Sequence, residues 1–408
     1  CLSDWSSDVC SSDLNNNIGI GYTTLYSNTG NSNTGIGHAA LYNNTTATNN
    51  VALGFSSLNA NTTGQYNVAV GSLALQYNTV AGGNVAVGYQ ALGANISGYN
   101  NVGLGYQALY TNTTGHNNTG LGYSALFYNT VGVQNTAVGS TSFLNNVSGS
   151  NNTALGYASL YANTTGSGNT AVGYNALYAN TTGADNVAIG YAALSGNTGG
   201  VTNTVVGRSA GLLNTVGYDN VFMGYTAGYS NSSGGDNVAI GSGASVTNTV
   251  GGNNTALGYI ALQFQTTASY NVALGSYAMN ANTTGAQNTA VGYAAMQYNI
   301  TGQNNVAVGC NALITNTYGD NNIAIGFSAL NANTTGGANV GIGMQSLVNN
   351  TTGYYNTAVG ASSLRQNTWG TNNTAIGLNA MVSNTTGIQN TSLGPQSLQA
   401  NTTGSNKI

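Results

Sequence analysis

Apolar and polar residues follow one fixed pattern along almost the whole chain. A phrase of the form Asn-x-Ala-aliphatic-Gly recurs, and its glycine stands at every seventeenth position from Gly37 to Gly394 without insertion or deletion. Gly21, sixteen residues before Gly37, marks one further unit, so residues 15–408 hold 23 units. We count positions within a unit from this marker glycine. A strict internal period of this kind is typical of repeat architectures, in which each unit stacks on its neighbours.

The residue types in each unit predict strands and turns rather than a helix. Gly, Asn, Thr and β-branched residues stand at fixed places, and all of them have poor helix propensity. The segments NTAVG (169–173) and YNALY (174–178) are short and bounded by Asn, Gly and Thr, which predicts two short strands joined by turns. We therefore expect an all-β fold: a parallel β-solenoid or β-roll with one coil per 17 residues and about 22–23 coils, covering 15–408 as a single domain.

Two apolar columns are expected to lie inside the coil: the aliphatic residue at position −1 and the Leu at position +4. Their burial stabilises one coil by about 3–6 kcal/mol. Ordering the backbone of 17 residues costs on the order of 17–34 kcal/mol. One coil therefore cannot fold alone, and many coils must fold together.

The Ala at position −2 is expected to face the other way, because successive side chains of a strand point to opposite faces. A strand that is apolar on both faces needs a partner on both. We therefore expect the Ala face to pack on other copies of the chain, in a homotrimer. Members of this column include Ala52, Ala69, Ala137 and Ala188.

Asn stands at position −4 in every unit, and at position +7 in every unit except the one with Gln265. Stacked Asn side chains can hydrogen-bond to one another and to turn backbone. We expect an asparagine ladder in which Asn67, Asn84 and Asn101 lie in one column. The Asn-Thr-Thr triplets that begin at position +7 also match the N-glycosylation acceptor pattern, which is an alternative use for the same residues.

The phrases NTAVGYxAL, NVAIGYAAL and NVALGSYAM resemble the head repeats of trimeric autotransporter adhesins. This resemblance implies a left-handed parallel β-roll, a trimer and a bacterial cell surface. The longer motif with ALYxNTTGxNNTA is similar to repeats of bacterial and phage tail-fibre proteins that end in a self-cleaving chaperone domain. The resemblance covers essentially the whole chain after Leu14, although adhesin head units are typically shorter than 17 residues.

The first fourteen residues, CLSDWSSDVCSSDL, do not match the repeat. This stretch resembles the translation, in one frame, of a common sequencing adapter. We interpret Cys1–Leu14 as an artefactual, non-native leader and exclude it from the fold. We also expect the chain to be a fragment whose natural ends are both missing.

Charge is almost absent from the chain, at 2% of residues, whereas an average domain is about a quarter charged. After Leu14 there are three basic and four acidic residues. Such a chain has no electrostatic footprint for nucleic acid, and it cannot hold an anionic membrane surface by charge. No apolar run approaches the roughly 20 residues of a membrane helix. We expect neither nucleic-acid binding nor membrane insertion.

Residues for catalysis or metal binding are few. His38 and His116 stand nearly five coils apart. Asp219 and Asp236 share position +12 in adjacent coils, and we interpret them either as solvated turn acids or as a shared cation site. Cys310 replaces Tyr in its column and is interpreted as a small packing residue. We therefore expect no enzyme activity, no cofactor and no resident metal.

Tyrosines form two aromatic columns. At position +1 they recur in two runs, and a second column at position +5 includes Tyr110, Tyr161 and Tyr178. Such rings could bind sugars through their faces and hydroxyl groups, or they could be a structural ladder or a seam between chains. We take the position +1 runs as candidate surface-contact residues: Tyr89, Tyr106, Tyr123, Tyr157, Tyr174 and Tyr191.

Residues 203–250 depart from the pattern. The Leu column there reads Gly211, Gly228 and Ser245, while Phe222 stands in the Ala column. The apolar residues are shifted within the unit, which we interpret either as a local repacking of the core or as a specialised contact site.

By elimination, these features predict a structural and adhesive extracellular fibre segment, either an adhesin head or a tail-fibre shaft. Weak contacts repeated along such a segment gain strength through multivalency. We expect it on a bacterial cell surface or a phage virion, with a host-cell or environmental surface as partner and glycans among the candidate ligands. The alternative from another class is an ice-binding β-solenoid, because Thr-Thr columns run along the chain.

Overall fold

The computed structural model describes residues 16–408. The chain divides into two units, Cys1–Thr202 and Asn203–Ile408, and the prediction of a single domain over 15–408 stays a prediction. The interpretation of Cys1–Leu14 as a leader lies outside the described residues. From residue 16 to the end both units contain strands and turns and no helix. Within that range there is consequently no helix that could cross a membrane.

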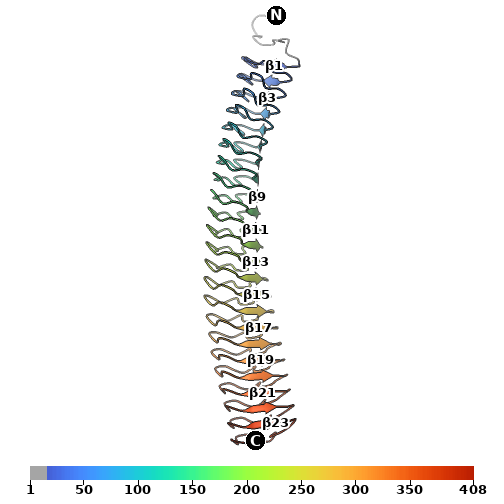
Figure 1. Ribbon diagram of the computed structural model, residues 1–408, viewed down its shortest axis with the longest axis vertical. Coiled ribbons are helices and arrows are strands. Elements are labelled where there is room, and N and C mark those ends of the chain that lie inside the picture. The colour runs from blue at the N-terminus through green and yellow to red at the C-terminus, as the bar shows by residue number, and fades with distance from the viewer. Residues whose placement is uncertain (1–15) are drawn as a thin grey trace, which may run out of the picture. The chain divides into compact units, whose positions relative to one another are not determined.

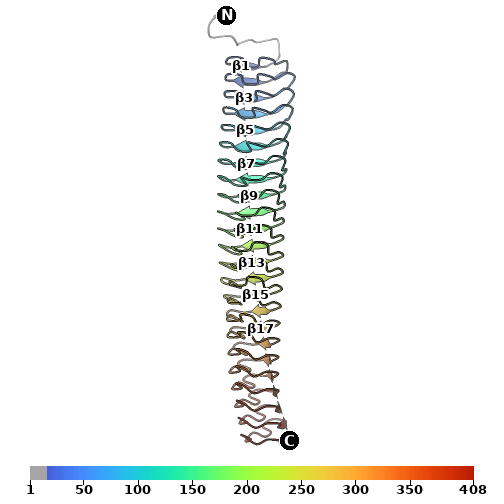
Figure 2. The same ribbon diagram turned by 90° about the vertical axis from the view of Figure 1, so that its left-hand side faces the viewer.

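Unit 1 is a parallel β-solenoid with one three-residue strand in each coil. Successive strands pair in parallel and in register, so that Thr170 lies beside Val187 and Ala171 beside Ala188. Figure 2 shows these strands one above the other. They are β1 (Ile18–Ile20), β2 (Thr34–Ile36), β3 (Val51–Leu53), β4 (Val68–Val70), β5 (Val85–Val87), β6 (Val102–Leu104), β7 (Thr119–Leu121), β8 (Thr136–Val138), β9 (Thr153–Leu155), β10 (Thr170–Val172) and β11 (Val187–Ile189).

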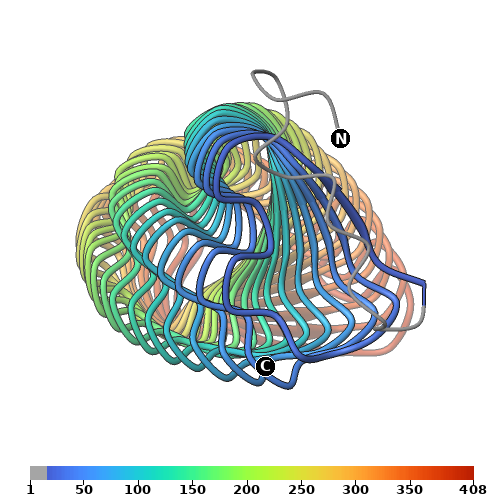
Figure 3. The ribbon, with the colours of Figure 1, turned by 90° about the horizontal axis from the view of Figure 1, so that it is seen from above.

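Unit 2 repeats the same architecture, which confirms the predicted solenoid with 17 residues per coil. Its strands also pair in parallel, with Phe222 beside Ala239, and Figure 1 labels every second one. Seen from above in Figure 3, each coil is a single turn of chain. The strands are β12 (Thr204–Val206), β13 (Val221–Met223), β14 (Val238–Ile240), β15 (Thr255–Leu257), β16 (Val272–Leu274), β17 (Thr289–Val291), β18 (Val306–Val308), β19 (Ile323–Ile325), β20 (Val340–Ile342), β21 (Thr357–Val359), β22 (Thr374–Ile376) and β23 (Thr391–Leu393).

The prediction of a second strand in each coil is wrong. In the segment YNALY, Asn175 and Leu177 have φ of 53° and 51°, which lies in the left-handed region rather than the extended one. The chain therefore curves over positions +1 to +6, and we call this stretch the arc. Backbone hydrogen bonds still join the coils there: Leu177 N–H donates to Ala193 C=O at 3.0 Å, and Asn175 N–H donates to Tyr157 C=O at 3.0 Å.

The strand faces the opposite way from the prediction. Ala188, at position −2, is fully buried inside its coil, whereas Ile189, at position −1, is 40% exposed. The Leu of the arc at position +4, such as Leu92, is buried opposite the strand. Its Cγ lies 3.3 Å from the place where a Cβ on Gly103 would stand. Only Gly or Ala fits at position −2 against the Leu column, so the larger aliphatic residue points outward.

The expectation that the Ala face packs on other chains is therefore wrong. That face forms the interior of the coil, and the residues expected to contact other chains are fully buried within it: Ala52, Ala69, Ala137 and Ala188. The outer face of each sheet instead carries Val or Thr at position −3 and the aliphatic residue at position −1. Apolar side chains therefore form a partly exposed stripe along each unit.

The marker glycine is required by both backbone conformation and close approach. Gly173 has a φ of 133°, where side-chain-bearing residues are rarely found. A Cβ added to it would lie 2.4 Å from the carbonyl oxygen of Gly190 in the next coil. Any other residue would push adjacent coils apart.

The predicted asparagine ladder at position −4 is confirmed. The Asn84 backbone N–H donates to Oδ1 of Asn67 at 3.0 Å, and Asn101 N–H donates to Oδ1 of Asn84 at 2.9 Å. The Asn84 Nδ2 also donates across the coil to the Gly98 carbonyl at 3.0 Å. These side chains are fully buried, and the ladder supplies the partners that buried amides require.

The Asn residues at position +7 form a second ladder. Nδ2 of Asn180 donates to Oδ1 of Asn163 in the coil before it at 2.7 Å, and to the Gly183 carbonyl of its own coil at 2.9 Å. Nδ2 of Asn169, at position −4, donates to the same Gly183 carbonyl at 2.9 Å. Both ladders thus meet at one carbonyl. Because the amide of Asn180 is fully buried and donates twice, this triplet presents no free amide for glycosylation.

The irregular block 203–250 is a repacked core. The Phe222 side chain at position −2 is 1% exposed, and Gly228 at position +4 lies against it. A Cβ on Gly228 would stand 2.6 Å from the Phe222 ring. The large residue has moved from the arc to the strand, and the small one from the strand to the arc.

Candidate functional site

The six predicted contact tyrosines lie on the surface of unit 1, at the start of the arc. Their exposed fractions run from 42% for Tyr89 to 56% for Tyr123. They stand there because the residue after the marker glycine begins the turn away from the sheet, with its side chain outside the coil. The structure brings them together in the two runs that the sequence predicted.

Within each run the rings stack on one another. The ring centroids of Tyr106 and Tyr123 are 5.3 Å apart with an interplanar angle of 6°. Those of Tyr157 and Tyr174 are 5.2 Å apart with an angle of 12°. Ring faces inside a run therefore cover each other, and only the end rings have an uncovered face. Sequence reasoning found the columns but missed this orientation, which depends on side-chain rotamers.

The second aromatic column, at position +5, runs beside the first. Tyr161 and Tyr178 stack at 5.1 Å, and Tyr110 lies 5.3 Å from Phe127. Residues at position +2 form the floor between the two columns. A groove thus follows the arc along part of unit 1.

Two hollows lie in this groove. The Tyr174 hollow has a volume of about 340 Å³ and is lined by Thr141, Tyr157, Ala158, Tyr161, Tyr174, Asn175 and Tyr178. The Tyr128 hollow has a volume of about 220 Å³ and is lined by Tyr123, Ser124, Phe127, Tyr128, Thr141 and Leu144. Both are aromatic and uncharged, and Thr141 borders both.

One polar atom in the Tyr174 hollow lacks a partner. Oδ1 of Asn175 is buried and accepts no hydrogen bond, although buried polar atoms nearly always have a partner. The residue stands at position +2, where its left-handed backbone, with a φ of 53°, suits Asn. No sequence signal marked this residue, because its position holds many residue types.

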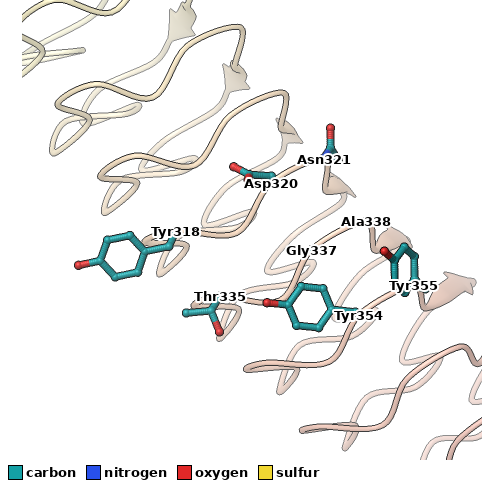
Figure 4. A pocket seen from close by; sticks show the side chains of 8 residues that line it. All are labelled: Tyr318, Asp320, Asn321, Thr335, Gly337, Ala338, Tyr354 and Tyr355. Atoms are coloured by element: carbon teal, nitrogen blue, oxygen red, sulfur yellow. The ribbon is translucent and has the colours of Figure 1, made fainter.

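A third hollow lies in unit 2, on the turn that follows the second Asn ladder. Its volume is about 210 Å³, and Tyr318, Asp320, Thr335 and Tyr354 are among its lining residues. Figure 4 shows Tyr318, Thr335 and Tyr354 on successive coils. The Tyr354 ring lies over Gly337, whose Cβ would stand 3.1 Å from it. The hollow is shallow because one glycine lies between larger side chains.

The sequence candidates for chemistry are structural parts of the coil. Asp219 and Asp236 occupy left-handed positions in adjacent coils, with φ of 52° and 58°, as acids in turns often do. From residue 16 onward no group of three or more His, Cys, Asp or Glu side chains could hold a metal ion. His38 lies in an aromatic stack between Tyr22 and Phe55.

The remaining candidates are also packing residues. The His116 ring stacks on Tyr99 at 4.5 Å, so it extends a surface stack of aromatic rings. Cys310 is a free, half-buried thiol at a position where neighbouring coils carry aromatic residues.

Comparisons with known proteins leave this geometry to stand by itself. No family model matches the sequence, and the search of curated proteins likewise finds no match. The groove, its two hollows and the repeated outer sheet therefore carry the functional argument.

Proposed function

We propose that this chain is a structural and adhesive segment of an extracellular fibre, an adhesin head or a tail-fibre shaft. It would act on a bacterial cell surface or a phage virion by presenting one surface many times. The observation that carries the proposal is the repetition of exposed Tyr side chains in register, with ring centroids 5.1–5.3 Å apart in the two runs. Several weak contacts on one rigid support bind much more tightly than one alone.

The residue inventory supports attachment rather than catalysis. The surface offers amide, hydroxyl and aromatic groups in quantity, whereas acids and bases are few and stand in turns. An enzyme site needs such groups within hydrogen-bond reach of one another. The partner we propose is a host-cell or environmental surface that carries glycans.

We propose further that the working form is a homotrimer, joined through the outer face of the sheet. Position −1 residues on that face are partly exposed, for example Val138 at 37%, Ile189 at 40% and Leu257 at 46%. Parallel sheets are normally covered on both faces. A second and third copy of the same chain would cover this stripe along its whole length.

Replacement of Tyr89, Tyr106 and Tyr123 with Ser tests the attachment surface. We expect at least tenfold weaker binding to a cell or glycan surface, because three of the repeated contacts are lost. The far-UV spectrum and the melting temperature should hold. The matched control replaces Tyr225, Tyr259 and Tyr293, the same column in unit 2, and should bind as the parent does. A collapse of the fold in the first variant would show that the column is only structural.

Mass measurement in solution tests the trimer. A refolded fragment should have three times the chain mass at micromolar concentration. Replacing Ile325 and Ile342 with Ser should shift it toward monomer, since each removes apolar area from the proposed contact. A soluble, stable monomer of the parent sequence would contradict the proposal.

The ice-binding alternative is separated by a thermal-hysteresis assay on the same fragment. Many Thr hydroxyls at position +8 already donate to the next coil, as Thr113 does to the Thr130 carbonyl at 2.9 Å. These hydroxyls are therefore oriented by the protein rather than toward an ice lattice. Thermal hysteresis without binding to glycans or cells would favour the alternative.

A further inference from the structure

The tyrosine column of unit 1 is interrupted once between its two runs. Ser140 takes position +1 there, so Tyr123 and Tyr157 stand two coils apart instead of one. These end rings are 56% and 52% exposed, compared with 45% for Tyr106 and for Tyr174 inside the runs. The difference is that expected if one face of each end ring is uncovered. We call the gap between them, over Ser140 and Thr141, the Ser140 slot.

A gap of this size in unit 2 holds a six-membered ring. Tyr259 and Tyr293 also stand two coils apart, with Ser276 between them. Tyr277 places its ring between the two, 5.6 Å from the Tyr259 ring and 5.8 Å from the Tyr293 ring, edge-on to both. The chain thus fills its own slot at this point.

The other serines of this column also have a bulky apolar side chain close by. Leu73 follows Ser72 in the sequence. Gly243 follows Ser242, and the Cγ2 of Ile260 lies 2.9 Å from the place where a Cβ on Gly243 would stand. The Ser140 slot instead has Thr141, whose Oγ1 donates back to the Ser140 carbonyl at 2.8 Å.

The Ser140 slot lies where the two hollows of the groove meet. Thr141 lines both the Tyr174 hollow and the Tyr128 hollow. No lining residue of either hollow is charged. The unpartnered Oδ1 of Asn175 stands in the Tyr174 hollow and requires a donor.

We propose that the Ser140 slot binds one pyranose ring of a neutral glycan whose chain continues along the groove. A pyranose offers C–H bonds on its faces, which suit the faces of Tyr123 and Tyr157, and hydroxyl groups around its rim, which suit polar groups at the edge of an apolar site. A hydroxyl of the neighbouring sugar donates to Oδ1 of Asn175. The absence of charged lining residues favours a neutral sugar over an acidic one. This inference rests on the proposed attachment function and names its ligand and its site.

The test fills the slot in two different ways. Ser140→Tyr continues the column with the residue that neighbouring coils already carry, and Thr141→Leu copies the residue that stands beside Ser72. Leu73 has a φ of 61° at that position, so Leu is compatible with the backbone there. Ser242→Tyr, in unit 2, is the matched control. The probe is an array of neutral and acidic oligosaccharides built from hexopyranose and N-acetylhexosamine units.

We expect the parent chain and Ser242→Tyr to bind a neutral oligosaccharide equally. Ser140→Tyr and Thr141→Leu should bind it at least tenfold more weakly, with unchanged far-UV spectra. Equal binding by all four proteins, or binding of acidic sugars only, would overturn the slot. Adherence to cells, measured on the same proteins, separates the two proposals. If Ser140→Tyr adheres as the parent does, the slot is wrong and the attachment function stands, whereas a parent that neither adheres nor binds glycans contradicts both.

Discussion

The ordinary coils of unit 1 and the block 203–250 of unit 2 build the same coil with opposite distributions of side-chain volume. In the coil around Gly173, Ala171 lies on the strand and Leu177 on the arc, both fully buried. In the coil around Gly224, Phe222 lies on the strand and Gly228 on the arc. Large and small residues have exchanged sides of the interior.

The exchange teaches that the solenoid conserves interior volume rather than residue identity. Protein interiors are close-packed, and swaps that keep volume are tolerated best. A Cβ on Gly228 would stand 2.6 Å from the Phe222 ring, just as the Leu column leaves room only for Gly or Ala on the strand. Backbone register is unchanged, because Phe222 still pairs with Ala239.

The largest expected effect comes from Phe222→Ala. The ring fills space that Gly211 and Gly228 leave open, so its removal creates a cavity that no neighbour can close. We expect a loss of about 3–5 kcal/mol in the free energy of unfolding. Hydrogen exchange of residues 203–250 measures it, with Leu177→Ala in unit 1 as the comparison. Protection equal to that of the parent would show that the ring is not a core element.

An intermediate effect is expected from Gly228→Leu, and it should be reversed by a second change. Alone, the new side chain collides with the Phe222 ring and costs about 1–3 kcal/mol. Combined with Phe222→Ala it restores the ordinary arrangement, so the double variant should be more stable than either single one. Thermal melting of the three variants gives the coupling. Simple additivity would refute the exchange.

The smallest expected effect concerns the one interruption of the second Asn ladder. Nε2 of Gln265 donates to the Ala268 carbonyl at 2.8 Å, and its Oε1 accepts from Asn271 of the other ladder at 3.1 Å. Gln265→Asn should restore the bonds to Asn248 and Asn282 and stabilise the chain by about 0.5–1.5 kcal/mol. A rise in melting temperature checks it. An unchanged or lower value would mean that the longer amide serves this coil equally well.

Much of the fold was predictable from the sequence because stacking imposes identity from coil to coil. The marker glycine, the Asn at position −4 and the Leu at position +4 each recur where a column demands one side chain, and their period predicted one coil per 17 residues. The tyrosine runs were visible for the same reason. Asn175 and the Ser140 slot were not, since they differ from neighbouring coils and depend on the rotamers of adjacent rings.

The sequence by itself determined the repeat, the parallel stacking, the asparagine ladder and the columns that carry the candidate surface. Only the tertiary structure decided which face of each strand lies inside. Alternation states that Ala188 and Ile189 point to opposite faces, but it does not say which face is the core. That choice depends on the width of the interior, which is set by the Leu on the arc. Because the left-handed arc brings Leu92 within 3.3 Å of the strand position, the small residue must point inward and the aliphatic stripe is left outside.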